Sequence, residues 1–134
     1  NRLAYQPLED GKATSYFGYR DNPTGGGVSF HQGLDIAAKQ DSPIYSMLFG
    51  VVTELGQNNS YGNYVRIYHG NGIEVLYAHC SQILVDKDAV IRAGEVVARV
   101  GSTGDSSGPH LHIEVLHKGI NYDPSDIVQL ENYA

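Results

Sequence analysis

Two histidines in this chain stand one residue apart, in the segment His110-Leu111-His112. Side chains two positions apart project from the same face of a β-strand, so both imidazoles would point into one space. The pattern can mark a metal site or a catalytic pair, but many β-proteins contain it by chance. The pair therefore indicates chemistry only if other donor residues join it.

His31 and Asp35 lie four residues apart, with Gly33 between them. The two side chains would converge if Gly33 lets the backbone turn. Zinc in hydrolytic sites commonly takes three protein ligands of the histidine and carboxylate types and leaves the fourth position to water. His31, Asp35 and one of His110 and His112 satisfy that count, and the spacing does not decide between the last two.

A hydrolase also needs a group that moves protons and a donor that stabilises the developing oxyanion. His79 is a candidate because it ends an expected strand whose alternate residues, Ile73, Val75 and Tyr77, form an apolar face. A polar residue at the end of such a stripe is often held in a site by the rigid strand. The alternative is a strand-end histidine that only reaches solvent.

The elements that must position these residues are β-strands. Sixteen glycines and short β-branched runs between turn residues predict an all-β fold with mainly antiparallel strands, and no segment has a long helical period. The pair Asn71-Gly72 between two apolar runs predicts a hairpin with a type I′ turn. Strands this short and this closely spaced are typical of a sandwich or barrel. We expect strands at residues 48–55, 64–68, 73–78, 83–85, 90–91, 95–100 and 111–116.

Two segments depart from this pattern. Residues 21–27 contain a proline and three glycines, and we expect a long mobile loop there that could line or cover a cleft just before His31. Residues 124–128 begin with a proline and predict a short helical turn with that proline in its first position.

Length and composition indicate one domain, covering residues 1–134. No apolar run approaches the ~20 residues of a membrane span, and residues 1–30 lack a signal-peptide pattern. We therefore expect a soluble, already trimmed chain. The net charge of −6, with scattered basic residues, argues against nucleic acid as a partner. The single cysteine, Cys80, excludes an internal disulfide and is expected to be a packing residue.

Four motifs occur in the same order as in a known family of enzymes. The chain resembles the zinc endopeptidases of the lysostaphin and LytM type, the M23 family, and the resemblance covers about residues 14 to 124, nearly the whole chain. Four ordered motifs are far more specific than a His-x-His pair alone. The motifs are Phe17-Gly18-Tyr19-Arg20, His31-Gln32-Gly33-Leu34-Asp35, Tyr77-Ala78-His79 and the segment from Ser102 to Glu114.

The resemblance implies a hybrid of sandwich and barrel with long loops and little helix, whose central antiparallel sheet forms the floor of an open groove. It implies one zinc ion per chain, with His31, Asp35 and His112 as its ligands and His79 and His110 as the catalytic pair. In such a site one histidine deprotonates the zinc-bound water, and the zinc ion and the other histidine stabilise the oxyanion. Which histidine is the base is left open. Since no His-Glu-x-x-His sequence is present, a histidine must replace the glutamate base of the common metalloproteases.

The resemblance also implies a substrate, namely peptide bonds in the stem or cross-bridge of bacterial peptidoglycan. Glycine bridges and D-alanyl-diaminopimelate bonds are both cut within the family, and the sequence does not choose between them. The implied location is outside the cytoplasm: the cell wall, the periplasm, the medium, or a membrane-anchored or phage-tail protein. We expect this domain to be excised from a longer protein, to insert into no membrane itself, and to meet protein partners through segments outside this chain.

Some positions depart from the family pattern or stay ambiguous. Residues 25–30 contain no tyrosine, which some family members place ahead of the first ligand as an extra oxyanion donor, and Asp88 replaces a turn glycine. Glu114 shares a strand face with the His-x-His pair, so it either hydrogen-bonds a ligand imidazole or is a solvated strand carboxylate. The remaining histidines, His69 and His117, are expected in the hairpin and on the surface.

Two other functions compete with the enzyme. A non-catalytic LytM-like relative would bind the wall or a partner protein as a scaffold or regulator, but such relatives are usually degraded at the ligand positions, and this chain keeps all five residues. A phosphocarrier site, of the kind found on a similar β-rich fold in sugar transport, has no need for the pair His31 and Asp35. If the enzyme hypothesis holds, activity should fade in mild acid, since histidines with an ordinary pKa of about 6.5 must be neutral to bind zinc.

Overall fold

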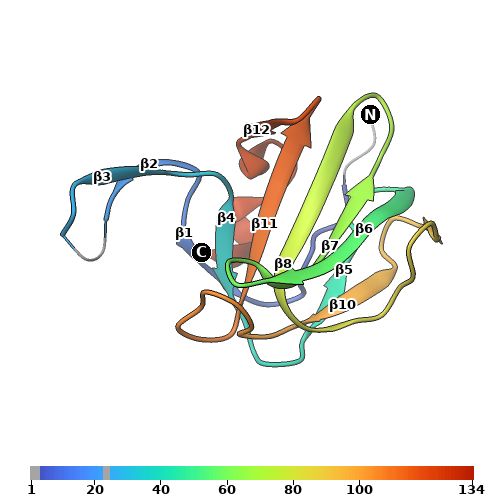
Figure 1. Ribbon diagram of the computed structural model, residues 1–134, viewed down its shortest axis with the longest axis horizontal. Helices are drawn as coiled ribbons and strands as arrows, with labels where there is room; N and C mark the ends of the chain where they lie inside the picture. Colours follow the sequence, from blue (N-terminus) through green and yellow to red (C-terminus); the bar gives the residue numbers. More distant parts are fainter. Residues whose placement is uncertain (1–3, 23–24) are drawn as a thin grey trace.

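The computed structural model describes residues 4–22 and 25–134, and nearly all of its regular structure is β-strand (Figure 1). Ten strands form one sheet, two more form a separate hairpin, and the strands of the described residues pair antiparallel throughout. The predicted all-β class with little helix is confirmed. The strands are β1 Lys12–Ser15, β2 Gly18–Asp21, β3 Val28–His31, β4 Leu34–Ala37, β5 Pro43–Tyr45, β6 Gly50–Asn58, β7 Gly62–Tyr68, β8 Ile73–Ile83, β9 Val90–Ile91, β10 Val96–Val100, β11 His110–His117 and β12 Ile120–Tyr122.

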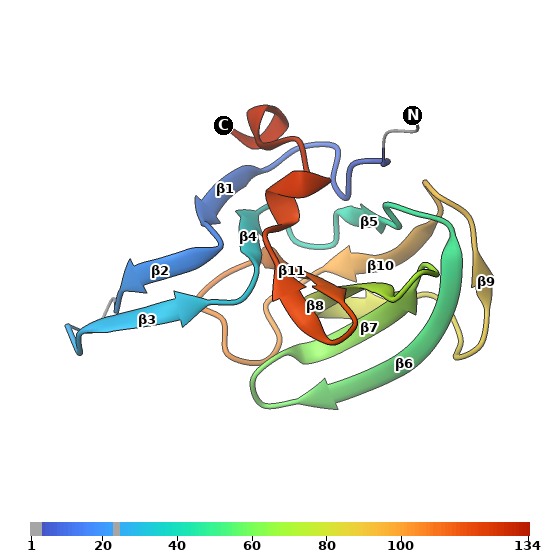
Figure 2. The same ribbon diagram turned by 90° about the horizontal axis from the view of Figure 1, so that it is seen from above.

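The long strand β8 is the centre of the large sheet. Its first part lies between β7 and β11, and its last part, from Cys80 onward, pairs with β10. Because β10 also pairs with β5, the sheet folds over an apolar interior. The order along the main path is β1-β4-β11-β8-β7-β6-β9, with β12 beside β11 (Figures 1 and 2). This arrangement combines features of a sandwich and a barrel, as predicted.

Alternation along the central strands separates the core from the opposite face of the sheet. In β11, Leu111 and Ile113 are buried in the main apolar core, whereas His110 and His112 project from the other face. Burial of each large apolar side chain stabilises the fold by roughly 1.5–3 kcal/mol. The neighbouring strands supply further core residues by the same alternation: Leu34, Ile36, Val65, Ile67, Val75 and Tyr77.

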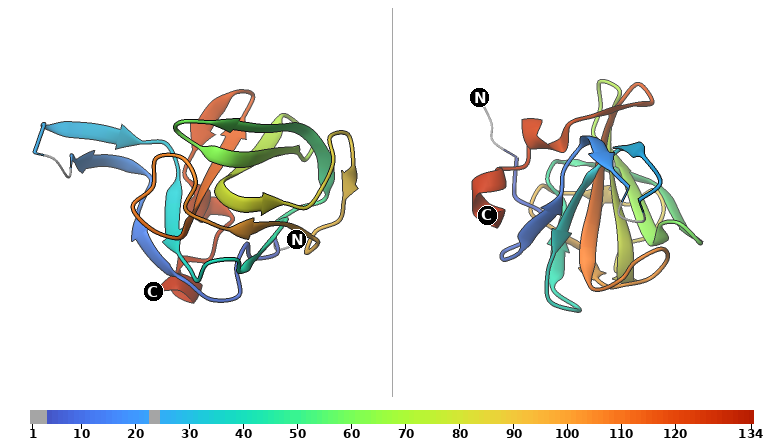
Figure 3. Two further views of the ribbon diagram at one scale, coloured as in Figure 1. Left: turned by 60° about the horizontal axis from the view of Figure 1, so that its bottom comes forward. Right: turned by 90° about the vertical axis from the view of Figure 1, so that its left-hand side faces the viewer.

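Strands β2 and β3 form a hairpin that projects from the body of the molecule (Figures 1 and 3). The loop predicted at residues 21–27 is therefore wrong in part, because Asp21 is the last residue of β2. The amide of Asn22 donates to the carbonyl oxygen of Gly27 at 2.7 Å, which closes the connection to β3. Residues 23 and 24 lie outside the described residues. The glycines mark a hairpin turn here. β2 has no apolar alternation, and β3 alternates only Val28 and Phe30 with polar residues over four positions, too few to identify a strand.

Most predicted strands are present with shifted ends. The strand predicted at residues 48–55 is β6, which begins at Gly50 and ends at Asn58. The separate strand predicted at 83–85 is wrong, because Ile83 is the last residue of β8 and the two residues after it lie outside any strand. Strands β1, β4, β5 and β12 were not predicted, since each has only three or four residues and no apolar run long enough to indicate it.

The predicted hairpin turn joins β7 to β8. Asn71 and Gly72 have positive φ angles of 54° and 80°, as a type I′ turn requires, and the amide of Ile73 donates to the carbonyl oxygen of Gly70 at 3.0 Å. Asp88 has a φ of 70°, which is the left-handed conformation expected where the family has a glycine.

Two 3₁₀ turns occur near the end of the chain. The first, Pro124–Asp126, has the proline in its opening turn as predicted, and the Asp123 side chain caps it by accepting from the amide of Ser125 at 2.9 Å. The second is Leu130–Tyr133. Within residues 4–22 and 25–134, no helix has the length and apolar character needed to cross a membrane.

Cys80 is buried in the main core, and burial raises the pKa of its thiol to about 12. The thiolate is the reactive form of cysteine. We therefore predict that the thiol reagent DTNB leaves the native chain unmodified and titrates one thiol per chain after unfolding in guanidinium. Rapid modification of the native protein, measured by absorbance, would contradict the packing role of Cys80.

Candidate active site

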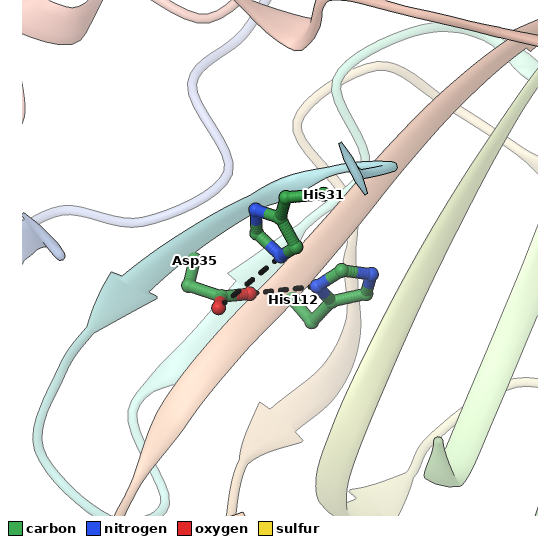
Figure 4. A group of neighbouring side chains, drawn as sticks. All are labelled: His31, Asp35 and His112. Carbon is green, nitrogen blue, oxygen red and sulfur yellow. Dashed lines mark hydrogen bonds and ion pairs between the residues drawn. The ribbon is translucent and has the colours of Figure 1, made fainter. Parts of the chain in front are cut away.

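Three strands bring His31, Asp35 and His112 together (Figure 4). His31 ends β3, Asp35 lies in β4, and the register between β4 and β11 sets His112 directly opposite Asp35. The carboxylate of Asp35 is shared, because one oxygen lies 2.6 Å from Nδ1 of His112 and the other lies 3.4 Å from Nε2 of His31. One donor atom from each residue lies within 4.8 Å of the other two. The three side chains could therefore hold one ion between them.

The end of β1 and the residue after it orient the ring of His31. Its Nδ1 lies 3.0 Å from the carbonyl oxygen of Tyr16 and 3.4 Å from Oγ of Ser15. A carbonyl oxygen only accepts, so Nδ1 carries the hydrogen and donates it. In the neutral ring this leaves the lone pair of Nε2 facing Asp35.

Gly33 allows β4 to approach β11 closely. A β-carbon at Gly33 would stand 2.4 Å from the carbonyl oxygen of Ile113 and 2.8 Å from Cε1 of His112. His31 and Asp35 converge across Gly33, where the backbone bends between β3 and β4, as predicted. The glycine is also needed for space against β11, although its φ angle is not positive.

The second ring nitrogen of His112 faces another carboxylate. Nε2 of His112 lies 2.9 Å from Oε2 of Glu114, whose surface is only 4% exposed. The hydroxyl of Tyr61 donates to the same oxygen at 2.9 Å, and the side-chain amide of Asn121 donates to Oε1 at 3.2 Å. Of the two alternatives for Glu114, the solvated carboxylate is wrong and the partner of an imidazole is confirmed. This contact fixes the His112 ring with Nδ1 toward Asp35.

The two carboxylates control the charge of His112. Burial lowers the pKa of His112, but the hydrogen bonds to Asp35 and Glu114 outweigh burial and raise the pKa to about 9. Burial raises the pKa of Asp35, but the hydrogen bonds and charges of His112 and His31 outweigh it, so its pKa lies well below the ordinary value. The site thus favours a positive charge between the carboxylates.

His79 and His110 form a second group, with ring centroids 4.6 Å apart. Nδ1 of His79 lies 2.7 Å from the carbonyl oxygen of Thr103, and Nδ1 of His110 lies 2.9 Å from that of Gly108 and 3.1 Å from Oγ of Ser106. Each Nδ1 therefore donates to a carbonyl, and each neutral ring keeps Nε2 as an acceptor. Burial lowers the pKa of His79 more than the bond to Thr103 raises it, so this ring is neutral at neutral pH.

His79 reaches this face of the sheet because of an irregularity in β8. The register with β7 moves from Tyr77 opposite Val65 to Cys80 opposite Asn63, which leaves one extra residue in β8. His79 also has a left-handed φ of 64°. Such a bulge turns the side chain at the extra position. The prediction that His79 shares the apolar face of Tyr77 is therefore wrong, because Tyr77 is in the core and His79 lines the cavity.

All five predicted residues line one open cavity of about 300 Å³. The ring centroids of His79 and His112 lie 5.9 Å apart, so the histidine pair and the carboxylate cluster face the same space. His69 and His117 are absent from the described lining, and Nδ1 of His69 lies 2.7 Å from the carbonyl oxygen of Phe49. The lining also includes Arg20, Phe30, Tyr61, Asp105 and Glu114.

Tyr61 and Arg20 were not predicted as site residues. The ring of Tyr61 stacks on that of His112, with centroids 6.0 Å apart and planes at 29°. Tyr61 lies in the turn between β6 and β7, where no periodicity indicates its direction. Arg20 belongs to one of the four motifs that carry the family resemblance, and its presence in that motif was the signal that could have identified it.

The cluster of His31, Asp35 and His112 fits a zinc ion. Two imidazole nitrogens and one carboxylate oxygen are ligand types that zinc takes in hydrolytic sites, where the remaining position is left to water. The buried carboxylate of Glu114 behind one imidazole is the kind of partner that orients metal-binding histidines.

An antiparallel β-fold that presents these donors beside a histidine pair is the architecture expected of the zinc peptidases that the sequence resembles. The chain belongs to peptidase family M23, whose profile matches residues 29–124. This confirms the resemblance inferred from the four motifs.

Several relatives share most of this chain. It is 42% identical over 122 residues to the DD-carboxypeptidase/endopeptidase Mpg of Neisseria meningitidis, covering 91% of this chain and 28% of Mpg. It is 34% identical to the peptidoglycan DD-endopeptidase ShyC of Vibrio cholerae, covering 90% of this chain and 28% of ShyC. The crystal structure of a zinc-containing peptidase from Vibrio cholerae matches with a TM-score of 0.84 and 34% identity, covering 91% of this chain and 39% of that one. The chain thus spans 28% of the length of these two curated relatives.

The close approach at Gly33 gives a prediction. Gly33→Ala places a β-carbon against Ile113 and His112, so we expect a loss of stability of about 1–3 kcal/mol from overpacking. We also expect zinc affinity to fall by about tenfold or more, because the His112 ring must move. Denaturant unfolding and competition with a chromophoric chelator measure the two effects. Gly26→Ala is the control, since the nearest atom, Nδ2 of Asn22, lies 3.6 Å away. Unchanged zinc affinity in Gly33→Ala would contradict the role of this contact.

Proposed function

We propose that this chain is the catalytic domain of a zinc-dependent endopeptidase that hydrolyses peptide bonds in the stem or cross-bridge of bacterial peptidoglycan. The observation that carries the proposal is the convergence of His31, Asp35 and His112 beside the pair of His79 and His110 in one open cavity. Membership of family M23 supports the reaction type, and the names of the relatives Mpg and ShyC support the substrate class.

In this proposal His31 binds zinc through Nε2, Asp35 through its carboxylate, and His112 through Nδ1. A bound zinc ion supplies Lewis acidity, which activates water and polarises a carbonyl group. Glu114 accepts the hydrogen of the other His112 nitrogen and so keeps the ring in its binding orientation. A solved relative described as zinc-containing supports the choice of metal.

In the proposed mechanism His79 and His110 accept the proton of the attacking water and stabilise the negative charge that develops on the carbonyl oxygen. Both rings are anchored through Nδ1, so both present Nε2 to the cavity side. One Nε2 takes the proton of the attacking water as general base. The other ring, when protonated, donates a hydrogen bond to the oxyanion of the tetrahedral intermediate. The low pKa of His79 keeps this ring available as a proton acceptor at neutral pH.

Peptidoglycan lies outside the cytoplasm, so we propose that the domain acts in the cell wall or periplasm, or after secretion. The matched relatives extend far beyond the part that this chain covers. We therefore assign anchoring and protein partners to segments outside this chain. The competing function is a non-catalytic scaffold, which would require none of the five residues to be intact.

Substitution of the histidine pair tests the mechanism. We predict that His79→Ala and His110→Ala each lower kcat/KM by about 100-fold or more, because a general acid or base contributes on that order. Both variants should keep one zinc per chain, whereas His112→Ala should lose it. Mass spectrometry of fragments released from purified peptidoglycans, with metal analysis in parallel, measures these effects.

His117→Ala is the matched control, because this histidine lies at the end of β11, outside the described lining of the cavity. It should retain activity and zinc. Failure of the intact, zinc-loaded chain to release fragments from any peptidoglycan type would overturn the enzyme and favour the scaffold.

The pKa of His112 predicts proton release on zinc binding. In the metal-free fold His112 is mostly protonated at pH 8, since its pKa is about 9, and Nδ1 must lose its hydrogen to bind zinc. Calorimetry in buffers of different ionisation enthalpy should show about one proton released per zinc at pH 8. The raised pKa also stabilises the metal-free fold below pH 6.5, and this stabilisation should disappear as the pH rises through 9. Zinc binding without proton release at pH 8 would contradict the assignment.

A further inference from the structure

Arg20 places a positive charge in the cavity that the proposed mechanism does not use. It lies in β2, where the hairpin register sets Gly18 opposite His31 and Arg20 opposite Ser29. Alternate residues of a strand share a face, so Arg20 and His31 lie on the same face of the hairpin, one diagonal step apart. Gly18 has no side chain to separate them, and no atom lies within 4 Å of where its β-carbon would stand.

Arg20 has few partners of its own. Its Nη1 donates to Oγ of Ser15, whereas Nε is buried and has no hydrogen-bond partner among the described residues. No carboxylate in residues 4–22 or 25–134 forms an ion pair with Arg20. Nε of Arg66 also has no hydrogen-bond partner among the described residues, but the Arg66 guanidinium differs from that of Arg20 in lying 3.4 Å from Glu54 and 3.3 Å from Glu74. Partial burial of a guanidinium without a carboxylate is costly, which indicates that the charge is kept for a ligand.

The other charges of the cavity leave this position free for an anion. Arg20 is the only lysine or arginine in the described lining, in a chain with a net charge of −6. Asp35 and Glu114 are turned toward His112, and the third carboxylate of the lining, Asp105, forms no ion pair among the described residues, with Arg20 or with any other cation. A guanidinium can donate to both oxygens of a carboxylate at once, in a fixed planar geometry. The ligand that best fits Arg20 is therefore a carboxylate on the substrate.

We propose that Arg20 binds the free α-carboxylate of the residue whose amino group leaves when the peptide bond is cut. The inference rests on the proposed function, since it concerns a peptide bound in the same cavity. Arg20 lies one diagonal step from His31, and such neighbours are about 7–8 Å apart, a distance that a long side chain spans. It can therefore reach a group next to the scissile bond while the carbonyl of that bond faces the cluster of His31, Asp35 and His112.

This assignment separates the two substrates that the sequence left open. In a bond between D-alanine and a second D-centre, the second centre keeps its own α-carboxylate free. This holds for a terminal D-alanine and for the D-centre of diaminopimelate. In a glycine bridge, the corresponding carboxyl group is itself part of an amide bond and carries no charge. Arg20 thus selects DD-peptide bonds over glycine bridges.

A purely structural role for Arg20 would give a different result. Oγ of Ser15 accepts from Arg20 and lies 3.4 Å from Nδ1 of His31, so Arg20 could also support the position of His31. Loss of such support would weaken zinc binding and lower the rate of cleavage of every substrate by the same factor. Loss of a carboxylate partner would slow only substrates that carry the free carboxylate.

The experiment uses two cross-linked stem-peptide dimers that differ in one group. In one dimer the α-carboxylate at the D-centre of diaminopimelate is free, and in the other it is a carboxamide. Chromatography gives kcat and KM for the zinc-loaded wild type, Arg20→Gln, Arg20→Lys and the control Arg92→Gln, which removes an exposed arginine outside the described lining. Metal analysis gives the zinc content of each.

We expect the wild type and Arg92→Gln to prefer the free carboxylate by about tenfold or more, chiefly through KM, as for a charge-assisted hydrogen bond. Arg20→Gln should lose this preference and keep one zinc per chain, and Arg20→Lys should keep part of it. If Arg20→Gln does not fold, the test compares the preference of the wild type for the free carboxylate with that of Arg20→Lys. A smaller preference in Arg20→Lys supports the role of Arg20, and an equal preference overturns it. The role of Arg20 would be overturned, and the proposed function left intact, if the wild type cleaved both dimers equally well. The same holds if Arg20→Gln lost activity by the same factor on both dimers. Absence of any cleavage by the wild type would instead overturn the proposed function, and the role of Arg20 with it.

Discussion

The register between β4 and β11 is the constraint on which the rest of the site depends. It places His112 opposite Asp35 at 2.6 Å, and Gly33 leaves the space that the His112 ring needs. A slip by one residue would turn Asp35 into the core and bring Leu34 or Ile36 into the cavity. Because both of these apolar residues are buried, the core and the donor cluster are fixed by the same pairing. The burial of apolar side chains on one face of the sheet therefore fixes the positions of Asp35 and His112 on the other face.

Two imidazoles in one cavity have opposite charge preferences because their neighbours differ. His112 lies between the carboxylates of Asp35 and Glu114, which favour its protonated form. His79 lies 5.9 Å from that ring, and burial and the nearby histidines favour its neutral form. The bulge in β8 creates this difference, since it moves His79 out of the core and places Nδ1 against the carbonyl oxygen of Thr103. A cation site and a proton acceptor can thus coexist on one sheet.

The sequence was sufficient for the fold class and for naming five residues that meet in one cavity, whose roles stay a proposal, but not for all of their surroundings. Strands with β-branched runs, such as β7, β8 and β11, were predicted because local composition determines them, whereas β1, β4 and β5 are too short to show a period. Spacing alone left His110 and His112 undecided, and only the ordered motifs separated their expected roles. The direction of His79 could not be predicted, because a bulge depends on pairing with a distant strand. Tyr61 was missed for the same reason, since tertiary contacts decide which side chains of a turn point inward, whereas Arg20 was missed although it lies in a family motif that could have identified it.

The projecting hairpin gives the ion a mechanical consequence as well as a chemical one. His31 and Arg20 belong to this arm, while Asp35 and His112 belong to the rigid sheet (Figure 1). Even without an ion, His31 joins the base of the arm to the sheet, since its Nε2 lies 3.4 Å from the carboxylate of Asp35 and its Nδ1 lies 3.0 Å from the carbonyl oxygen of Tyr16. A zinc ion bound as proposed would add a direct link between the arm and the sheet, and so between the two sides of the cavity.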